Sequence, residues 1–200
     1  MQDFKKHEQF ELEVLNILNS ARLLSKLIFA GGTMLRLCYG LDRYSVDLDF
    51  WLDDKVDPSA FFPRLKKILR ENYDLSDSCD KRFTMLFEFK SEKYPRSLKI
   101  EIRKNMKNVR VERLIAYGPN SNIQVMVKAV CIEEMMRAKI EAFLSRGEIR
   151  DVYDIEFMLK RGVKLPGDKE VLKKVIKKIC LLYTSPSPRD LSTSRMPSSA

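Results

Sequence analysis

Two aspartates separated by one residue carry the strongest chemical signal in this sequence. Asp47 and Asp49 alternate with the apolar residues Leu48 and Phe50, a pattern typical of a half-buried strand whose side chains at i and i+2 share one face. Paired carboxylates could hold the hard divalent cations that bridge a triphosphate and activate an attacking hydroxyl. The pair alone is weak evidence, because a solvated strand face has the same appearance.

A Gly-Gly turn precedes the two aspartates. Gly31 and Gly32 follow a short apolar run, and they lead into a helix that we expect at 33–39 with Thr33 as its N-cap. Backbone N–H groups of such a turn can approach a phosphate closely, and a helix N-terminus adds positive potential there. The residues between Thr33 and Asp47 are enough for a short helix and a return strand, so we expect the turn to lie beside the carboxylates.

A third carboxylate is Glu101, which lies in the alternating stretch from Leu98 to Ile102. An exposed strand residue would have the same pattern, so Glu101 is a candidate metal ligand only in combination with the two aspartates.

Histidine and cysteine chemistry is sparse in this chain. His7 is the one histidine, and the four cysteines have no C-x-x-C spacing. We therefore expect neither a zinc site nor a histidine-based triad, and any general base must be a carboxylate. Cys38 and Cys131 are interpreted as core residues, and no disulfide is expected.

The periodicity of the sequence predicts the elements that must position these residues. Apolar residues at helical spacing indicate helices, and alternation or short apolar runs indicate strands. Helices are predicted at 4–26, 33–39, 58–72, 132–146, 150–161 and 168–179, and strands at 27–30, 46–52, 83–90, 97–103, 110–117 and 123–128. The fold class is therefore α+β, with a mixed or antiparallel sheet of about five or six strands, flanked by helices and followed by a helical part. The expected boundaries are 1–128 for the sheet domain and 129–179 for the helical part.

The last residues differ in character from the rest. Residues 180–200 are rich in Ser and Pro without hydrophobic periodicity, and they resemble a translated sequencing adapter. We expect them to form a disordered tail outside the fold, so that the natural C-terminus is missing and the activity of this form is in question.

Two separated blocks of residues resemble one known family. The Gly-Gly turn, the spacer, Asp-x-Asp and a later strand carboxylate are similar to the DNA polymerase β nucleotidyltransferases. The first block runs from Ala30 to Phe50 and resembles the AbiEii/AbiGii branch, which includes the MenT-type toxins. The second block has Glu133-Glu134, Lys139, Ala142, Arg146 and then Arg150-Asp151-Val152-Tyr153-Asp154. The resemblance implies a nucleotidyltransferase fold and an enzyme that uses a nucleoside triphosphate.

The resemblance also implies roles for individual residues. On their own, Lys139 and its neighbours would be interpreted as a solvated helix face. By the resemblance, Asp47, Asp49, Lys139 and Asp151 are catalytic. The implied nucleotide-binding residues are Gly31, Gly32, Thr33, Arg36, Ser45, Lys139 and Asp154, and the implied ligands of one or two Mg²⁺ ions are Asp47, Asp49 and Glu101.

Charge and the resemblance together suggest the acceptor. The net charge is +9, and it stays +8 without Arg189, Asp190 and Arg195 of the expected tail, which favours an anionic partner. We expect a cytoplasmic toxin of a toxin–antitoxin or abortive infection system, with a cognate antitoxin protein and no membrane span. Its expected reaction is nucleotide transfer to RNA, at the 3′ end of tRNA. The alternatives are transfer to a small molecule or protein hydroxyl, and a non-catalytic nucleotide-binding module.

Overall fold

A mixed sheet of seven strands is the centre of the fold. The computed structural model describes residues 2–104, 109–166 and 169–184. The chain divides into two compact units, Met1–Met135, which contains the sheet, and Met136–Ala200. The strand order is β3-β4-β5-β2-β1-β7-β6. The pairs β1–β7 and β2–β5 are parallel, and the other neighbouring pairs are antiparallel. The strands are β1 (Leu27–Ala30), β2 (Asp47–Leu52), β3 (Asp74–Asp80), β4 (Thr84–Lys90), β5 (Leu98–Arg103), β6 (Val111–Ala116) and β7 (Val125–Val130).

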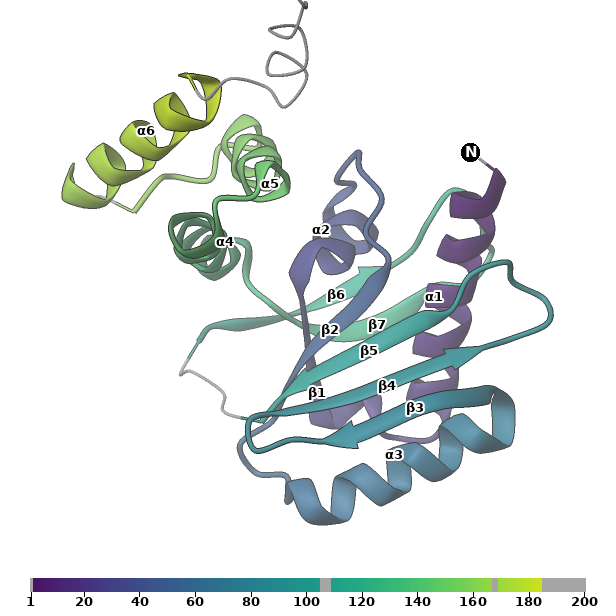
Figure 1. Ribbon diagram of the computed structural model, residues 1–200. Coiled ribbons are helices and arrows are strands. Elements are labelled where there is room, and N and C mark those ends of the chain that lie inside the picture. Colours follow the sequence, from purple (N-terminus) through teal and green to yellow (C-terminus); the bar gives the residue numbers. More distant parts are fainter. Residues whose placement is uncertain (1, 105–108, 167–168, 185–200) are drawn as a thin grey trace, which may run out of the picture. The chain divides into compact units, whose positions relative to one another are not determined.

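Helices accompany the sheet and then follow it. In the first unit they are α1 (Gln2–Ser20), the short 3₁₀ helix η1 (Leu24–Lys26), α2 (Gly31–Tyr39) and α3 (Pro58–Asn72). They are followed by α4 (Ile132–Arg146), α5 (Ile149–Lys160) and α6 (Lys169–Thr184). Figure 1 shows α3 beside β3 and α2 at the ends of β1 and β2. None of the helices in the described residues is long and apolar enough to span a membrane. The predicted α+β class is confirmed.

The buried face of the sheet is covered by α1 and α3. The ring centroid of Phe10 in α1 lies 5.7 Å from that of Phe89 in β4, and the ring of Phe62 in α3 lies 4.9 Å from that of Phe87. Phe87 is paired with Ile100 of β5, which is paired in turn with Leu48 of β2, so these side chains share one face. The residues that alternate with Leu48 along β2, which are the two aspartates, must therefore point to the opposite face.

Three predicted elements differ from the observed ones. The strand β3 was missed, because Asp and Ser dominate its sequence and have low strand propensity. It is tolerated as an edge strand that pairs only with β4. The predicted helix 4–26 is wrong over its last turns, because α1 ends at Ser20 and Arg22 has a left-handed φ of 56°. Thr33 is not an N-cap, since α2 begins at Gly31 with Ala30 in the cap position.

The second unit is a helical assembly. The Lys178 ammonium in α6 donates to the carbonyl of Leu144 at 2.6 Å and lies 5.7 Å from the ring centre of Phe143, so α6 packs on the end of α4. Gly147 joins α4 to α5 with φ of 74°, and an added Cβ would lie 2.9 Å from the Lys178 side chain. The helix α6 continues to Thr184 and so includes residues 180–184 of the predicted disordered tail, and residues 185–200 lie outside the described part.

Burial of Phe50 should contribute more to the stability of β2 than any other side chain of that strand. Its ring is 1 % exposed and stacks on Phe29 of β1 with a centroid distance of 5.1 Å. Phe50→Ala should lower the free energy of unfolding by about 3–5 kcal/mol, because it removes buried surface and leaves a cavity. Chemical denaturation measures this change. The matched control is Met126→Ala on β7, where the side chain is 61 % exposed and the change should stay within about 0.5 kcal/mol. Equal losses for the two variants would contradict the packing described.

Candidate active site

Three carboxylates lie on one face of the sheet, on neighbouring strands. The parallel pair β2–β5 places Asp49 beside Glu101 and Asp47 beside Lys99. Residues in register on adjacent strands point to the same side at a spacing of about 4.8 Å. The Glu101 side chain is 31 % exposed, and its Oε1 lies 3.9 Å from Arg103 Nε. The three predicted metal ligands therefore occupy one partly open face, but their ligand atoms do not form a group within 4.8 Å of one another in the described residues.

The glycine turn lies directly against Asp49. Gly31 has φ of 80°, and a Cβ added to it would lie 2.2 Å from Asp49 Oδ2. A Cβ on Gly32 would lie 2.7 Å from Arg43 Nη2 and 3.0 Å from Ser45 Oγ. The N-cap residue of α2 is Ala30, which forms no side-chain cap bond, and the first N–H groups of a helix are donors that can bind an anion. The turn lies beside Asp49, as its spacing predicted, and Ser45, which the resemblance implied, also lies next to it.

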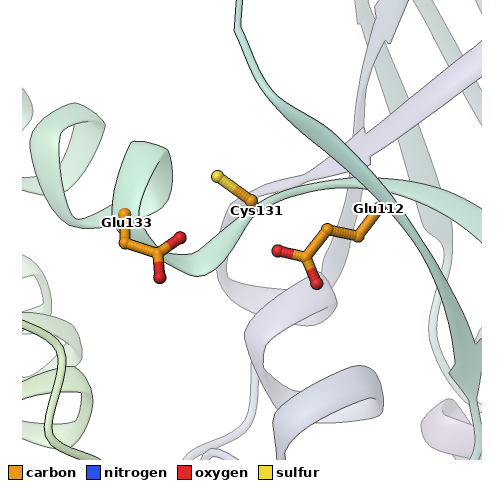
Figure 2. Close-up of side chains that lie close together, drawn as sticks. All are labelled: Glu112, Cys131 and Glu133. Atoms are coloured by element: carbon orange, nitrogen blue, oxygen red, sulfur yellow. The ribbon is translucent and has the colours of Figure 1, made fainter.

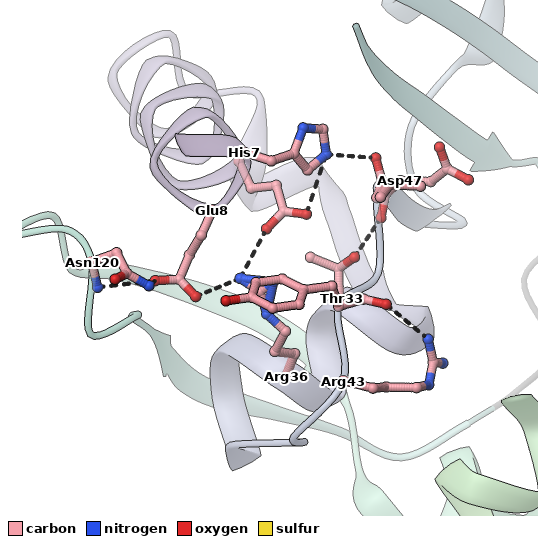
Figure 3. Close-up of polar contacts among 10 residues, drawn as sticks. His7, Glu8, Thr33, Arg36, Arg43, Asp47 and Asn120 are labelled. Atoms are coloured by element: carbon pink, nitrogen blue, oxygen red, sulfur yellow. Dashed lines mark hydrogen bonds and ion pairs between the residues drawn. The ribbon is translucent and has the colours of Figure 1, made fainter. Parts of the chain in front are cut away.

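Two side chains hold the backbone at the start of β2. The Thr33 hydroxyl donates to the carbonyl of Asp47 at 2.6 Å. The Nε2 atom of His7 lies 3.0 Å from the carbonyl oxygen of Val46. Figure 3 shows both contacts, one from α1 and one from α2. Thr33 was predicted to bind nucleotide, and its hydroxyl is used for this internal bond instead, so only its backbone N–H is left for that role.

A buried ion network lies behind this backbone. Arg36 Nη2 donates to Glu8 Oε2 at 2.5 Å and lies 3.6 Å from Glu11 Oε2, while Asn120 binds Glu8 through its backbone N–H at 3.0 Å. Arg36 is only 8 % exposed, and its guanidinium lies 4.6 Å from the ring centre of Tyr44. The predicted contact between Arg36 and a nucleotide stays a prediction, and any such contact would compete with these carboxylates.

Sequence reasoning missed His7, Glu8 and Glu11. All three are buried, and Glu11 is completely so. A signal was present, because His7 and Glu11 precede Leu15 and Leu18 on one stripe of α1 at helical spacing. Charged residues inside an apolar stripe indicate buried ionic partners.

The residues of the second block converge within the helical unit. The ammonium of Lys139 lies 2.7 Å from Asp154 Oδ2 and 3.6 Å from Asp151 Oδ1. Arg146 donates two hydrogen bonds to Asp151, at 2.7 and 2.6 Å. Burial opposes ionisation of Asp151, but the bonds from Arg146 and the charge of Lys139 hold the pKa of Asp151 below its usual value. Lys139 is therefore buried and paired with carboxylates, whereas its sequence context alone indicated a solvated lysine. Its predicted contact with a triphosphate stays a prediction.

A second group of potential ligands lies at the end of β7. One ligand atom each from Glu112, Cys131 and Glu133 lies within 4.8 Å of the others, and Figure 2 shows the three side chains close together. Such a mixed set suits a borderline cation such as Zn²⁺. The thiol of Cys131 already forms a hydrogen bond with Glu133, which also lies 3.5 Å from Arg110 Nη2. Glu133 therefore already has a partner within the protein.

Glycine at position 31 should be required for the carboxylate geometry. Gly31→Ala strains a left-handed backbone and forces the Asp49 carboxylate away, so Mn²⁺ binding, used as a probe for Mg²⁺ and measured by calorimetry, should be lost. Stability should fall by at least about 1 kcal/mol. Gly162→Ala is the matched control, because Gly162 has φ of 83° but no atom within 4 Å of an added Cβ. The control should lose stability and keep Mn²⁺ binding, and undiminished Mn²⁺ binding by Gly31→Ala would refute the contact.

Burial of Glu11 should make stability depend on pH. Burial raises the pKa of Glu11 from 4.5 to about 8, so the folded protein retains a proton that the unfolded chain releases. The stabilisation that this proton provides is present below about pH 4.5 and is lost as pH rises to about 8. Relative to wild type, Glu11→Gln should therefore gain at least about 1 kcal/mol, or about 2–4 °C in Tm, between pH 5 and pH 9.

Thermal unfolding at the two pH values measures the Glu11 effect. The exposed carboxyl of Glu92 supplies the control, and Glu92→Gln should follow the wild-type profile. A gain for Glu11→Gln that is equal at both pH values would show that Glu11 titrates as an exposed carboxyl does.

Comparisons with known proteins agree with this geometry. A family model described as "Nucleotidyl transferase AbiEii toxin, Type IV TA system" matches residues 14–196. No match to a curated protein was found. Among solved structures, JHP933 from Helicobacter pylori is 23 % identical with a TM-score of 0.51, and the alignment covers 75 % of this chain and 64 % of that one. A candidate nucleotidyltransferase from H. pylori is 22 % identical with a TM-score of 0.52, covering 76 % and 68 %.

The structural similarity and the family match establish different things. At these identities the two H. pylori structures show a common fold, and the chain spans only 64 % of the length of JHP933. The family model covers most of the chain, including both blocks of candidate site residues, and its description agrees with the enzyme class predicted from the sequence. The chain therefore belongs to the AbiEii family of nucleotidyl transferase toxins of type IV toxin–antitoxin systems.

Proposed function

We propose that this protein transfers a nucleotide from a nucleoside triphosphate to RNA, with the 3′ end of tRNA as acceptor, as the toxin of a type IV toxin–antitoxin system. One observation carries the proposal. The N-terminus of α2 lies in contact with Asp49, on the sheet face that also holds Asp47 and Glu101. A helix N-terminus binds anions and a carboxylate group binds cations, and a metal-bound triphosphate needs both at contact distance.

The donor chemistry of the three carboxylates suits one or two Mg²⁺ ions, whose binding would draw the side chains closer together. Asp47, Asp49 and Glu101 present only oxygen donors on a partly open face, and Mg²⁺ prefers such donors together with water and phosphate. A bound Mg²⁺ would supply neutralisation of the triphosphate charge and activation of the acceptor hydroxyl. Asp47 or Asp49 would accept the proton of that hydroxyl as a general base.

Backbone groups would bind the triphosphate. The backbone N–H groups of Gly31, Gly32 and Thr33 belong to the first turn of α2, and the hydroxyl of Ser45 is next to Gly32. This arrangement supports phosphate binding by the turn, because N–H donors and the helix dipole act together there. The absence of a Cβ at both glycines allows the close approach.

Lys139 would stabilise the charge that develops on the triphosphate. Its ammonium is 8 % exposed and is oriented by Asp154 and Asp151. A cation with a fixed position stabilises a transition state without reorganisation. In this proposal Asp151 and Asp154 act by orienting Lys139, and Arg146 acts by holding Asp151.

The RNA acceptor is supported by charge. The chain has a net charge of +9, and the lysines on the exposed side of α6 include Lys173, Lys174 and Lys177. Basic surfaces bind RNA phosphates without regard to sequence. Nucleoside triphosphates and tRNA are available in the cytoplasm, where a cognate antitoxin would counteract the toxin.

Transfer should be seen with purified protein. The wild-type chain would be incubated with each labelled nucleoside triphosphate, Mg²⁺ and total cellular RNA, and label should appear in small RNA. Asp47→Asn should abolish transfer, because one metal ligand and candidate base is lost. Label only in protein or small molecules would refute the RNA acceptor, and no transfer under any condition would favour a nucleotide-binding module.

Loss of the Lys139 charge should reduce the rate. Lys139→Met should lower kcat by roughly 10²-fold, the scale of one lost electrostatic contact in a transition state. The matched control is Lys160→Met, because Lys160 in α5 also pairs with a carboxylate, Glu156 at 2.8 Å, but is exposed. Single-turnover rates of the two variants and the wild type would be compared. Equal rates for both variants and the wild type would show that Lys139 has only a structural role.

A further inference from the structure

We propose that His7 is a positioning residue for the reaction, because its imidazole holds the Val46 carbonyl and thereby sets the place of the neighbouring Asp47 carboxylate. The inference rests on the proposed function, since it assigns a role to Asp47. His7 belongs to α1, far from β2 in the sequence, and is 1 % exposed. Its Nε2 lies 3.0 Å from the oxygen of Val46 (Figure 3).

The start of β2 needs this support because β1 is too short to supply it. The last residue of β1, Ala30, pairs with Asp49, so Asp47 lies beyond the end of that strand. The chain leaves β1 at Gly31 to begin α2, which is what creates the anion-binding turn. The carbonyls of Val46 and Asp47 accept hydrogen bonds from His7 and Thr33 instead. The same chain reversal that makes the turn therefore leaves the aspartate strand dependent on two side chains.

The contact fixes the form of the imidazole. A carbonyl oxygen only accepts hydrogen bonds, so Nε2 must carry the hydrogen. Burial lowers the pKa of His7 and favours the neutral ring, so Nδ1 carries no proton. Nδ1 is buried without a hydrogen-bond partner in the described residues, which is unfavourable for folding. The ring also lies 3.7 Å from Glu11 Oε1 and packs edge-on against Phe10.

The ion network behind His7 keeps α1 in place against α2. Glu8 accepts from Arg36 and from both nitrogens of Asn120. Gly118 allows this approach, because a Cβ there would lie 2.4 Å from the Glu8 carboxylate. These contacts leave α1 little freedom to slide or rotate. The imidazole therefore has a fixed position from which it can act on β2.

A displaced Val46 carbonyl would move Asp47, and small displacements matter for transfer. A shift of about 1 Å in a reacting group can lower a rate by roughly 10²-fold. Removing an outer hydrogen bond that orients a metal ligand typically costs about 10–100-fold in metal affinity or activity. His7 touches none of the reacting atoms, so its effect should appear in kcat and in metal affinity more than in the KM for the nucleotide.

Two variants of similar size separate positioning from packing. His7→Gln keeps an N–H donor that can reach Val46, whereas His7→Met fills the space without a donor. We expect His7→Met to lower kcat and Mn²⁺ affinity about 10-fold or more, with KM changed less than about threefold and Tm lowered by no more than about 4 °C. His7→Gln should stay within about threefold of wild type in kcat and Mn²⁺ affinity. Wild-type kcat and Mn²⁺ affinity in His7→Met, or equal losses in both variants, would overturn the proposal.

A spectroscopic measurement tests the contact without any transfer reaction. The chain has a single histidine, so ¹⁵N imidazole NMR of untagged protein gives one assignable ring. A neutral ring protonated at Nε2 near pH 7 is expected, and protonation at Nδ1 would overturn the proposal. If wild type transfers no nucleotide, the proposed function fails, but the ring tautomer and the Mn²⁺ affinities of the two variants still decide the role of His7.

Discussion

The structure depends on the contact between a helix N-terminus and a strand carboxylate at Gly31. No other residue fits there, because the backbone is left-handed and a Cβ would lie 2.2 Å from the Asp49 oxygen. The contact places the negative carboxylate of Asp49 at the positive end of α2, which stabilises both the ionised carboxylate and the helix. It also requires β1 to end at Ala30 so that α2 can begin at once. The first turn of α2 and a carboxylate proposed to bind metal are thereby placed side by side.

The early end of β1 has consequences across the first unit. The strand β2 begins before it has a partner in β1, so Thr33 and His7 supply hydrogen bonds that a strand would have supplied. Next to His7 lies a buried network of Glu8, Glu11 and Arg36, although burying charges is unfavourable. The ionic interior of α1 is best understood as support for a carboxylate site on the opposite face of the sheet.

Local patterns in the sequence predicted the parts of the site that lie close together in the chain. The alternation around Asp47 and the glycine turn predicted the strand, the turn and the shared face of Asp47 and Asp49. Contacts between distant segments were not predictable, because the bond from His7 to Val46 depends on how α1 packs, not on local propensity. Thr33 was misassigned for the same reason, since its hydroxyl serves Asp47 rather than the end of α2. The edge strand β3 was missed because pairing with β4 overrides a polar sequence.

A crystal structure with Mn²⁺ and a non-hydrolysable nucleoside triphosphate would test the central claim most directly. The anomalous signal of manganese locates the ion without assumptions about the protein. The account predicts a manganese peak bound by Asp47, Asp49 and Glu101, with triphosphate oxygens at the N–H groups of Gly31 and Gly32. A peak at Glu112, Cys131 and Glu133 with none at the aspartates, or a triphosphate bound away from the first turn of α2, would contradict it.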